Sequence, residues 1–235
     1  MRPTVLLLAA LGLAAGLAAQ TQTLDLTPGS PFTAIRVGDV FEVEVVRGDT
    51  YGVVVETTDH YAARLTTSVE DSVLVLDMED VKWRLKGENL LKATITLPYL
   101  AGVDIREAAS VQSKEPWRSA AFSLQSSGAS VVQLALDAER VDVAATGVSD
   151  ITLAGATNEL EVNAGGAAEI HALYLISRFV KLASSGAAEV SVYAEEALTG
   201  NASGTSDIKY TGPAPRVDVS SAGVSVVERT QPIGS

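Results

Sequence analysis

The chain has 235 residues, a net charge of −12 and no cysteine. The lack of cysteine excludes disulfide bonds, thiolate metal sites and an N-terminal lipidated cysteine. An acidic protein of this kind repels phosphate backbones, so nucleic acid is not an expected partner.

The first 19 residues have the features of a secretory signal peptide. Arg2 gives a short positive start, an apolar stretch follows from Val5, and small residues lead to polar sequence at Gln20. Cleavage after Ala19 leaves a chain of charge −12 − 1 = −13. A membrane anchor is the alternative, but the apolar run of about 16 residues is shorter than the roughly 20 that a spanning helix needs. We expect an exported protein in the periplasm, on the outer surface or secreted, with no integral membrane segment after cleavage.

A repeat of about 19 residues is the strongest signal in the chain. Glycine followed by small residues recurs at intervals of 18 to 20 residues, at Gly128, Gly147, Gly166, Gly186, Gly204 and Gly223. A degenerate earlier copy, Ala108-Ala109-Ser110-Val111, begins 20 residues before Gly128. The glycines are expected to mark corners of the chain, where φ is positive or where two backbones approach closely.

Apolar residues keep a fixed register to these glycines. The fourth residue after each glycine is β-branched: Val132, Ile151, Ile170, Val190, Ile208 and Val227. Apolar residues also stand six and four positions before most of the glycines, as Phe122 and Leu124 do before Gly128. Residues spaced by two face one side of a strand. Each repeat therefore predicts a strand, a glycine turn and a second short strand.

One repeat of this size cannot bury its own apolar face, whereas stacked copies can. The sequence thus predicts an all-β fold, a parallel β-solenoid with coils of about 19 residues, and right-handed because crossovers between parallel strands usually are. A β-sandwich is the alternative, but it needs hairpin turns and no such constant register. We expect a linker over 20–31, the solenoid over 32–229 and a flexible tail over 230–235. Within the solenoid, 116–229 holds the regular coils, and 32–115 holds less regular coils or a capping β region.

Three segments resemble a known family, the auto-transporter adhesin head domain or head GIN domain of exported bacterial proteins. They are the Ser-Gly-Ala-Ser-like repeats, the opening Phe32-Thr33-Ala34-Ile35-Arg36-Val37 with Phe41-Glu42-Val43-Glu44-Val45, and the step Thr96-Leu97-Pro98-Tyr99-Leu100. The resemblance covers roughly 32–229 and implies a β-helical fold with an adhesin-like role.

A carboxylate stands three residues after four successive glycines, at Asp150, Glu169, Glu189 and Asp207. If the coils stack in register, neighbouring carboxylates lie about 5 Å apart along one corner. Such a row could bind Ca²⁺ or a polysaccharide. The alternative is a row of solvated turn residues that keeps other strands from pairing with this surface.

No residue set predicts a catalytic centre. The only histidines are His60 and His171, and His171 falls in an outward, mixed row, so the serines near the glycines lack a general base. These serines are expected to bond the turn backbone. With two histidines and no cysteine, no zinc site is expected, and no cofactor apart from Ca²⁺. We expect a non-enzymatic binding protein for a glycan or protein partner. The alternatives are a structural envelope protein and a polysaccharide-active enzyme.

Overall fold

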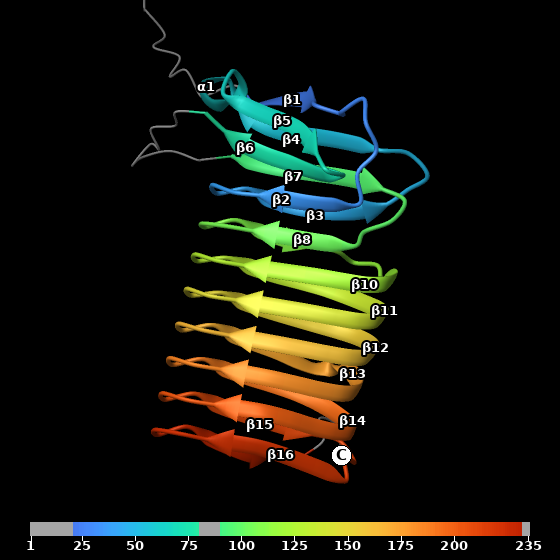
Figure 1. The fold of residues 1–235 in the computed structure, drawn as a ribbon. Coiled ribbons are helices and arrows are strands. Elements are labelled where there is room, and N and C mark those ends of the chain that lie inside the picture. The colour runs from blue at the N-terminus through green and yellow to red at the C-terminus, as the bar shows by residue number, and fades with distance from the viewer. Residues whose placement is uncertain (1–20, 80–89, 232–235) are drawn as a thin grey trace, which may run out of the picture.

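The computed structural model describes residues 21–79 and 90–231, and in these ranges the chain is a stack of β-coils (Figure 1). The predicted signal peptide and the end of the predicted tail lie outside the described residues. The strands and the single short helix are, in chain order, β1 (Thr21–Asp25), β2 (Ala34–Val37), β3 (Glu42–Arg47), β4 (Gly52–Thr58), α1 (Asp59–Ala62), β5 (Leu65–Glu70), β6 (Val73–Met78), β7 (Leu91–Leu97), β8 (Gly102–Ile105), β9 (Ser110–Gln112), β10 (Trp117–Ser126), β11 (Val131–Ala145), β12 (Asp150–Ala164), β13 (Glu169–Ser184), β14 (Glu189–Ala202), β15 (Asp207–Thr211), β16 (Arg216–Ser221) and β17 (Val226–Arg229). No helix in the described ranges has the length and apolarity that a membrane span needs.

The second half of the chain is a parallel β-solenoid, as the repeat predicts. Strands β10 to β17 pair in parallel with the equivalent segments one coil away. Ile151, for example, pairs with Val132 on one side and with Ile170 on the other. The offset of 19 residues in the sequence is therefore the length of one coil.

Each regular coil has two flat sides joined by two different corners (Figure 1). One corner is the glycine turn. At the other corner the strand bends without breaking, so β11 runs from one glycine turn to the next as 15 continuous residues. Two consecutive residues, Glu139 and Arg140, are exposed at the bend, and the alternation of buried and exposed residues changes phase there. The two strands of the predicted repeat are thus the halves of successive bent strands.

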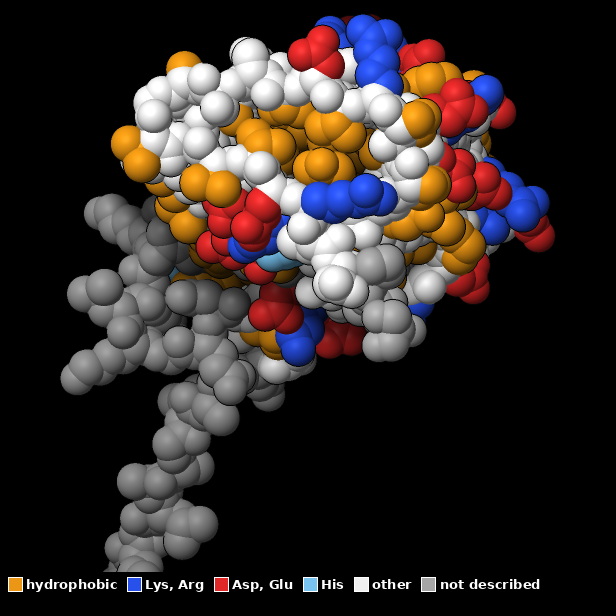
Figure 2. All heavy atoms as spheres, turned by 90° about the horizontal axis from the view of Figure 1, so that it is seen from below, with side chains coloured by type: hydrophobic (Ala, Val, Ile, Leu, Met, Phe, Trp, Pro, Cys, Tyr) orange, Lys and Arg blue, Asp and Glu red, His pale blue; other side chains and the backbone are white. Residues whose placement is uncertain are grey.

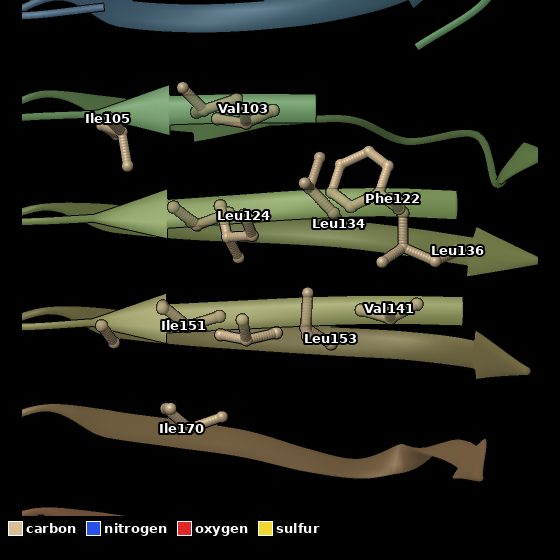
Figure 3. Packing of buried hydrophobic residues seen from close by; sticks show 14 of the residues in the cluster. Val103, Ile105, Phe122, Leu124, Leu134, Leu136, Val141, Ile151, Leu153 and Ile170 are labelled. Atoms are coloured by element: carbon tan, nitrogen blue, oxygen red, sulfur yellow. The ribbon is translucent and has the colours of Figure 1, made fainter. Parts of the chain in front are cut away.

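The core lies between the two sides and is built from the predicted rows. Val132, Ile151, Ile170, Val190 and Ile208 are all fully buried, as are Leu124 and Val143 on the opposite side. Figure 3 shows Leu124, Ile151 and Leu153 pointing into the space between the layers. Burial of one such side chain contributes about 1.5–3 kcal/mol, and the ladder repeats this contribution in every coil.

The glycine corner shows both features expected from the sequence, a positive φ and a close approach of two backbones. Gly147 has φ +80°, and a Cβ at this position would lie 2.5 Å from the carbonyl oxygen of Gly128. The N–H of Val148 donates to that same oxygen, at 2.7 Å, which ties the two corners together. In the coil that precedes Gly128, the equivalent corner residue is Glu107, with φ +61°. The degenerate copy therefore lies 21 residues before Gly128, and its corner residue is Glu107, not Ala108.

The first part of the chain combines both predicted possibilities, irregular coils and a cap. The coil β2–β3 lies directly on the coil β8–β9, because β2 pairs with β8 and β3 with β9. The chain between them climbs to the N-terminal end of the stack, where β6 pairs with β2 and β7 with β3. Antiparallel pairings of β5 with β6, β4 with β7 and β1 with β4 then cover this end.

The predicted linker over 20–31 begins as a strand, which is a correction to the sequence reading. Residues Thr21–Asp25 form β1 and pair antiparallel with β4, so this segment belongs to the cap. Thr23 and its neighbours alternate in polarity too weakly to show this from sequence, since β1 buries no side chain fully. The predicted tail is attached where it starts, because the N–H of Thr230 donates to the carbonyl oxygen of Tyr210.

Candidate functional site

Four carboxylates stand in register on one flat side of the solenoid. Asp150 pairs with Glu169, Glu169 with Glu189, and Glu189 with Asp207, each in neighbouring strands. All four side chains point outward and are between 39% and 60% exposed. We call Asp150, Glu169, Glu189 and Asp207 the acidic row. Neighbouring strands in a sheet lie about 4.8 Å apart, so the row places like charges at close intervals.

Two basic groups lie beside the acidic row. Lys209 Nζ is 2.7 Å from Glu189 Oε1 and 3.3 Å from Asp207 Oδ2. His171 Nε2 is 3.8 Å from Glu169 Oε2 and 3.9 Å from Asp150 Oδ1. The hydrogen bond to Glu189, and then that to Asp207, raises the pKa of Lys209. The row therefore carries its own counter-charge at its C-terminal end.

Sequence reasoning did not connect these two residues with the acidic row. His171 and Lys209 both stand five residues after their glycines, two beyond the carboxylate of the same coil. Residues spaced by two in a strand point to the same face. That spacing is a signal that would have placed both basic groups next to the acids.

A hollow of about 500 Å³ lies on the same sheet, next to the N-terminal end of the acidic row. The register continues from Asp150 through Val131 and Ser110 to Glu42, so the hollow and the row lie along one line of strands. Charged and polar side chains from β3, β4, β7, β9 and β11 line it, among them Glu42, Glu44, Glu56, Lys92, Gln112 and Gln133. Lys92 Nζ lies 3.8 Å from Glu42 Oε2, so both signs of charge are present.

An exposed tyrosine stands on the same side of the solenoid as the acidic row, about 13 Å from it along the strand, because four residues separate Asp150 from the tyrosine's partner Ala154. Tyr174 is 61% exposed and pairs with Ala154, two residues beyond the pair of Thr152 with His171. The register shifts between these two pairs, which inserts an extra residue in β13. The coil from Gly166 to Gly186 is accordingly 20 residues long. This longer spacing is the sequence signal for Tyr174, which a search for a regular aromatic row misses.

We call the outward surface that holds the hollow, the acidic row and Tyr174 the acidic face. It is an open surface and not an enclosed cleft. In the described ranges, no group of three or more His, Cys, Asp or Glu side chains is arranged to hold a metal ion. The carboxylates of this face can accept hydrogen bonds from a ligand, and the ring of Tyr174 can stack on it.

Residues 31–214 match the family described as "Putative auto-transporter adhesin, head GIN domain". The chain belongs to this family. The resemblance seen in the glycine repeats and the opening segment is thereby confirmed. No curated protein matches the chain at a significant level.

Solved structures resemble the chain over almost its whole length. A "putative adhesin" from Bacteroides fragilis is 23% identical with a TM-score of 0.84, covering 91% of this chain and 98% of that one. A "putative adhesin" from Parabacteroides merdae is 16% identical with a TM-score of 0.70, covering 90% and 97%. A "putative lipid binding protein" from Parabacteroides distasonis is 17% identical with a TM-score of 0.67, covering 90% and 97%. At these identities the likeness establishes the fold.

The serines of the head GIN repeats serve the corners. Ser149 Oγ donates to the carbonyl oxygen of Thr146 at 2.7 Å, and Ser206 Oγ donates to that of Ser203 at 2.8 Å. Both serines are about 1% exposed. A buried hydroxyl that is already donating to the backbone is not available as a nucleophile.

Proposed function

We propose that this chain is an exported, non-enzymatic, adhesin-like protein of the bacterial cell envelope that binds a glycan through its acidic face. The observation that carries the proposal is the in-register row of four exposed carboxylates on the same side of the solenoid as the exposed Tyr174. Adhesin names among the family and its structural relatives support the general role. Export rests on the signal peptide predicted for residues 1–19.

A glycan fits this face better than an anionic partner does. Sugar hydroxyls donate hydrogen bonds to carboxylates, and the apolar side of a sugar ring stacks on an exposed aromatic side chain. The repeat distance of the coils, about 4.8 Å, offers an acceptor at regular intervals along an extended chain. A protein partner with a row of basic side chains is the second possibility, and the acidic row supports it through charge alone.

The non-enzymatic part of the proposal rests on the geometry around the histidines. His171 faces the carboxylates of Asp150 and Glu169, an arrangement that does not pair a serine hydroxyl with a base. Glycoside hydrolysis by two carboxylates needs an acid and a base held on either side of one bond, usually inside a cleft. The acidic row lies on an open sheet, which supports retention of a ligand without cleavage.

The test is a binding experiment with an internal control. The chain from Gln20 onward is incubated with insoluble xylan, mannan, chitin and peptidoglycan, with and without Ca²⁺, and both bound protein and newly released chain ends are measured. A variant carries D150N, E169Q, E189Q and D207N. A matched control carries E70Q, E115Q, E139Q and E195Q, which remove the same charge from exposed sites away from the row.

We expect retention on at least one polysaccharide, its loss in the row variant and its preservation in the control. Release of new chain ends would overturn the non-enzymatic assignment. Equal loss in both variants would show that net charge matters and the row does not. Retention on none of the four would favour a structural role in the envelope.

A further inference from the structure

The two ends of the stack differ. The N-terminal end is covered by β1, β4, β5 and α1, which bury Tyr61 and Phe32 (Figure 1). The C-terminal end consists of β16 and β17, each of which pairs with only one strand in the described part of the chain, β14 and β15 respectively. The outer edges of two strands, with their N–H and C=O groups, therefore face away from the stack.

Apolar side chains are uncovered at this C-terminal end. Val217 is 39% exposed, whereas the equivalent Val141 and Leu198 in earlier coils are fully buried. Figure 2, which looks onto this end, shows apolar side chains gathered in its middle within a ring of polar and charged groups. Repeat proteins normally need a capping repeat with a polar outer face, because an open edge and an open core invite association.

The rim of this end is electrically neutral in a strongly acidic chain. Residues 212–231 contain Arg216 and Arg229 against Asp218 and Glu228, so their net charge is 2 − 2 = 0, while the whole chain carries −12. Two copies repel one another over most of their surfaces, and the C-terminal end is a place where this repulsion is absent. A rim that carries both signs can also complement itself across a two-fold axis.

We infer that the C-terminal coil is a homodimer interface, in which the ends of two copies stack on each other. A two-fold axis perpendicular to the stack, running along or across the strands, sets the facing strands antiparallel, which extends both sheets from one copy into the other. The apolar middle of each end then covers that of its partner. Because the cap blocks the opposite end, the contact closes after two copies and does not propagate into a fibre.

The first test is the mass of the chain from Gln20 onward, measured by sedimentation velocity from about 1 to about 100 µM, the range in which micromolar affinities are resolved. We expect a monomer–dimer equilibrium with no larger species. A monomer at every concentration would overturn the inference. The inference would also fail if a chain truncated after Gln231 dimerised and the full chain did not. Residues 232–235, and not a second copy, would then cover this end.

The second test uses charge swaps on β16. Arg216 and Asp218 are exposed, so neither R216E nor D218K removes a core contact. R216E makes the rim 1 − 3 = −2 and D218K makes it 3 − 1 = +2. We expect each swap alone to weaken the homodimer about tenfold or more, and an equimolar mixture of the two to recover a heterodimer.

A matched variant, E70K in the N-terminal cap, changes the net charge as D218K does and leaves the C-terminal rim intact. It should dimerise at least as well as the parent chain. Unchanged thermal unfolding in the monomeric state shows that each swap folds. If R216E and D218K dimerise as the parent does, and their mixture gains nothing, the contact lies elsewhere and the inference fails.

Discussion

Lys209 and Glu189 form an ion pair across two neighbouring coils, with 2.7 Å between Nζ and Oε1. The pair belongs to the C-terminal half of the acidic row, where Lys209 also lies 3.3 Å from Asp207. Beside the N-terminal half the basic group is His171, 3.8 Å from Glu169 and 3.9 Å from Asp150. The two halves therefore differ in charge, and the less compensated half is the one next to the hollow.

Replacing this lysine tests how much the internal cation matters. We expect K209M to lower the free energy of unfolding by less than about 1 kcal/mol, since exposed ion pairs contribute little. The pKa of Lys209 is raised, so the pair's contribution is complete at neutral pH and is lost only as the pH rises through that raised pKa. Urea unfolding at low and high salt measures the effect, which should shrink with salt. K181M, which removes a more exposed lysine paired with Glu161, is the control. A salt-independent loss in K209M would contradict the electrostatic explanation.

The carboxyl group of Asp39 has a raised pKa, and this residue stands at the N-terminal end of the column of stacked glycine corners. Partial burial, and next the hydrogen bond to Asp77 and the charge of Glu107, raise the pKa of Asp39 to about 6, although the N–H of Met78 donates to it and opposes the change. The charge of Arg106 interacts with Asp77 and Glu107. Asp39 itself has φ +54°, a conformation that asparagine also tolerates.

This raised pKa gives the protein a pH-dependent stability with a definite sign. The folded state holds the Asp39 proton more tightly than the unfolded state, so this contribution is complete below about pH 4 and is lost as the pH rises through about 6. We expect D39N to be more stable than the parent chain at pH 7.5, by about 1 kcal/mol after allowance for solvent screening, and equal to it at pH 4. Thermal unfolding of both chains from pH 4 to 8 measures this. D71N, at an exposed position that also has positive φ, is the control and should not remove the pH dependence.

The glycine corner predicts a large cost for a single methyl group. G147A adds a Cβ 2.5 Å from the carbonyl oxygen of Gly128 and places alanine at φ +80°. We expect a loss of about 2 kcal/mol or more in unfolding free energy, because the strained φ and the clash add. G29A is the control, since a Cβ there meets no atom within 4 Å. Equal urea midpoints for the two variants would show that the corner can relax and that its glycine is dispensable.

The regular coils could be predicted because one periodic signal controls them. Every coil repeats the same buried β-branched position and the same turn, so register, core and corner follow from the spacing of six glycines. The bend opposite the glycine corner could not be read in this way. The bend is marked only by two consecutive exposed residues, such as Glu139 and Arg140. These two positions are not filled by one characteristic residue type in every coil.

The N-terminal part shows where sequence reasoning stops. Alternating segments predict strands there. However, β2 pairs with both β6 and β8, so the order of the strands in the stack differs from their order in the chain. Local patterns carry no information about such long-range pairing. In the candidate site, the acidic row follows from the repeat, whereas the hollow depends on strands from the irregular part and could not be predicted.

The last prediction concerns Tyr174, whose exposure follows from the extra residue in its coil. If the acidic face binds a glycan as proposed, Y174A should reduce retention on the bound polysaccharide about tenfold, because one aromatic stacking contact is worth on the order of 1 kcal/mol or more. The unfolding temperature should not change, since the ring is 61% exposed and buries little surface on folding. F179A is the matched control: Phe179 is also exposed, lies at the bend of β13 in register with Arg140, and packs under Arg178 with 5.0 Å between the guanidinium and the ring. Loss of retention in F179A but not in Y174A would move the binding surface to the bend of the solenoid. Unchanged retention in both would show that neither ring contacts the glycan and would leave the carboxylates to carry the binding.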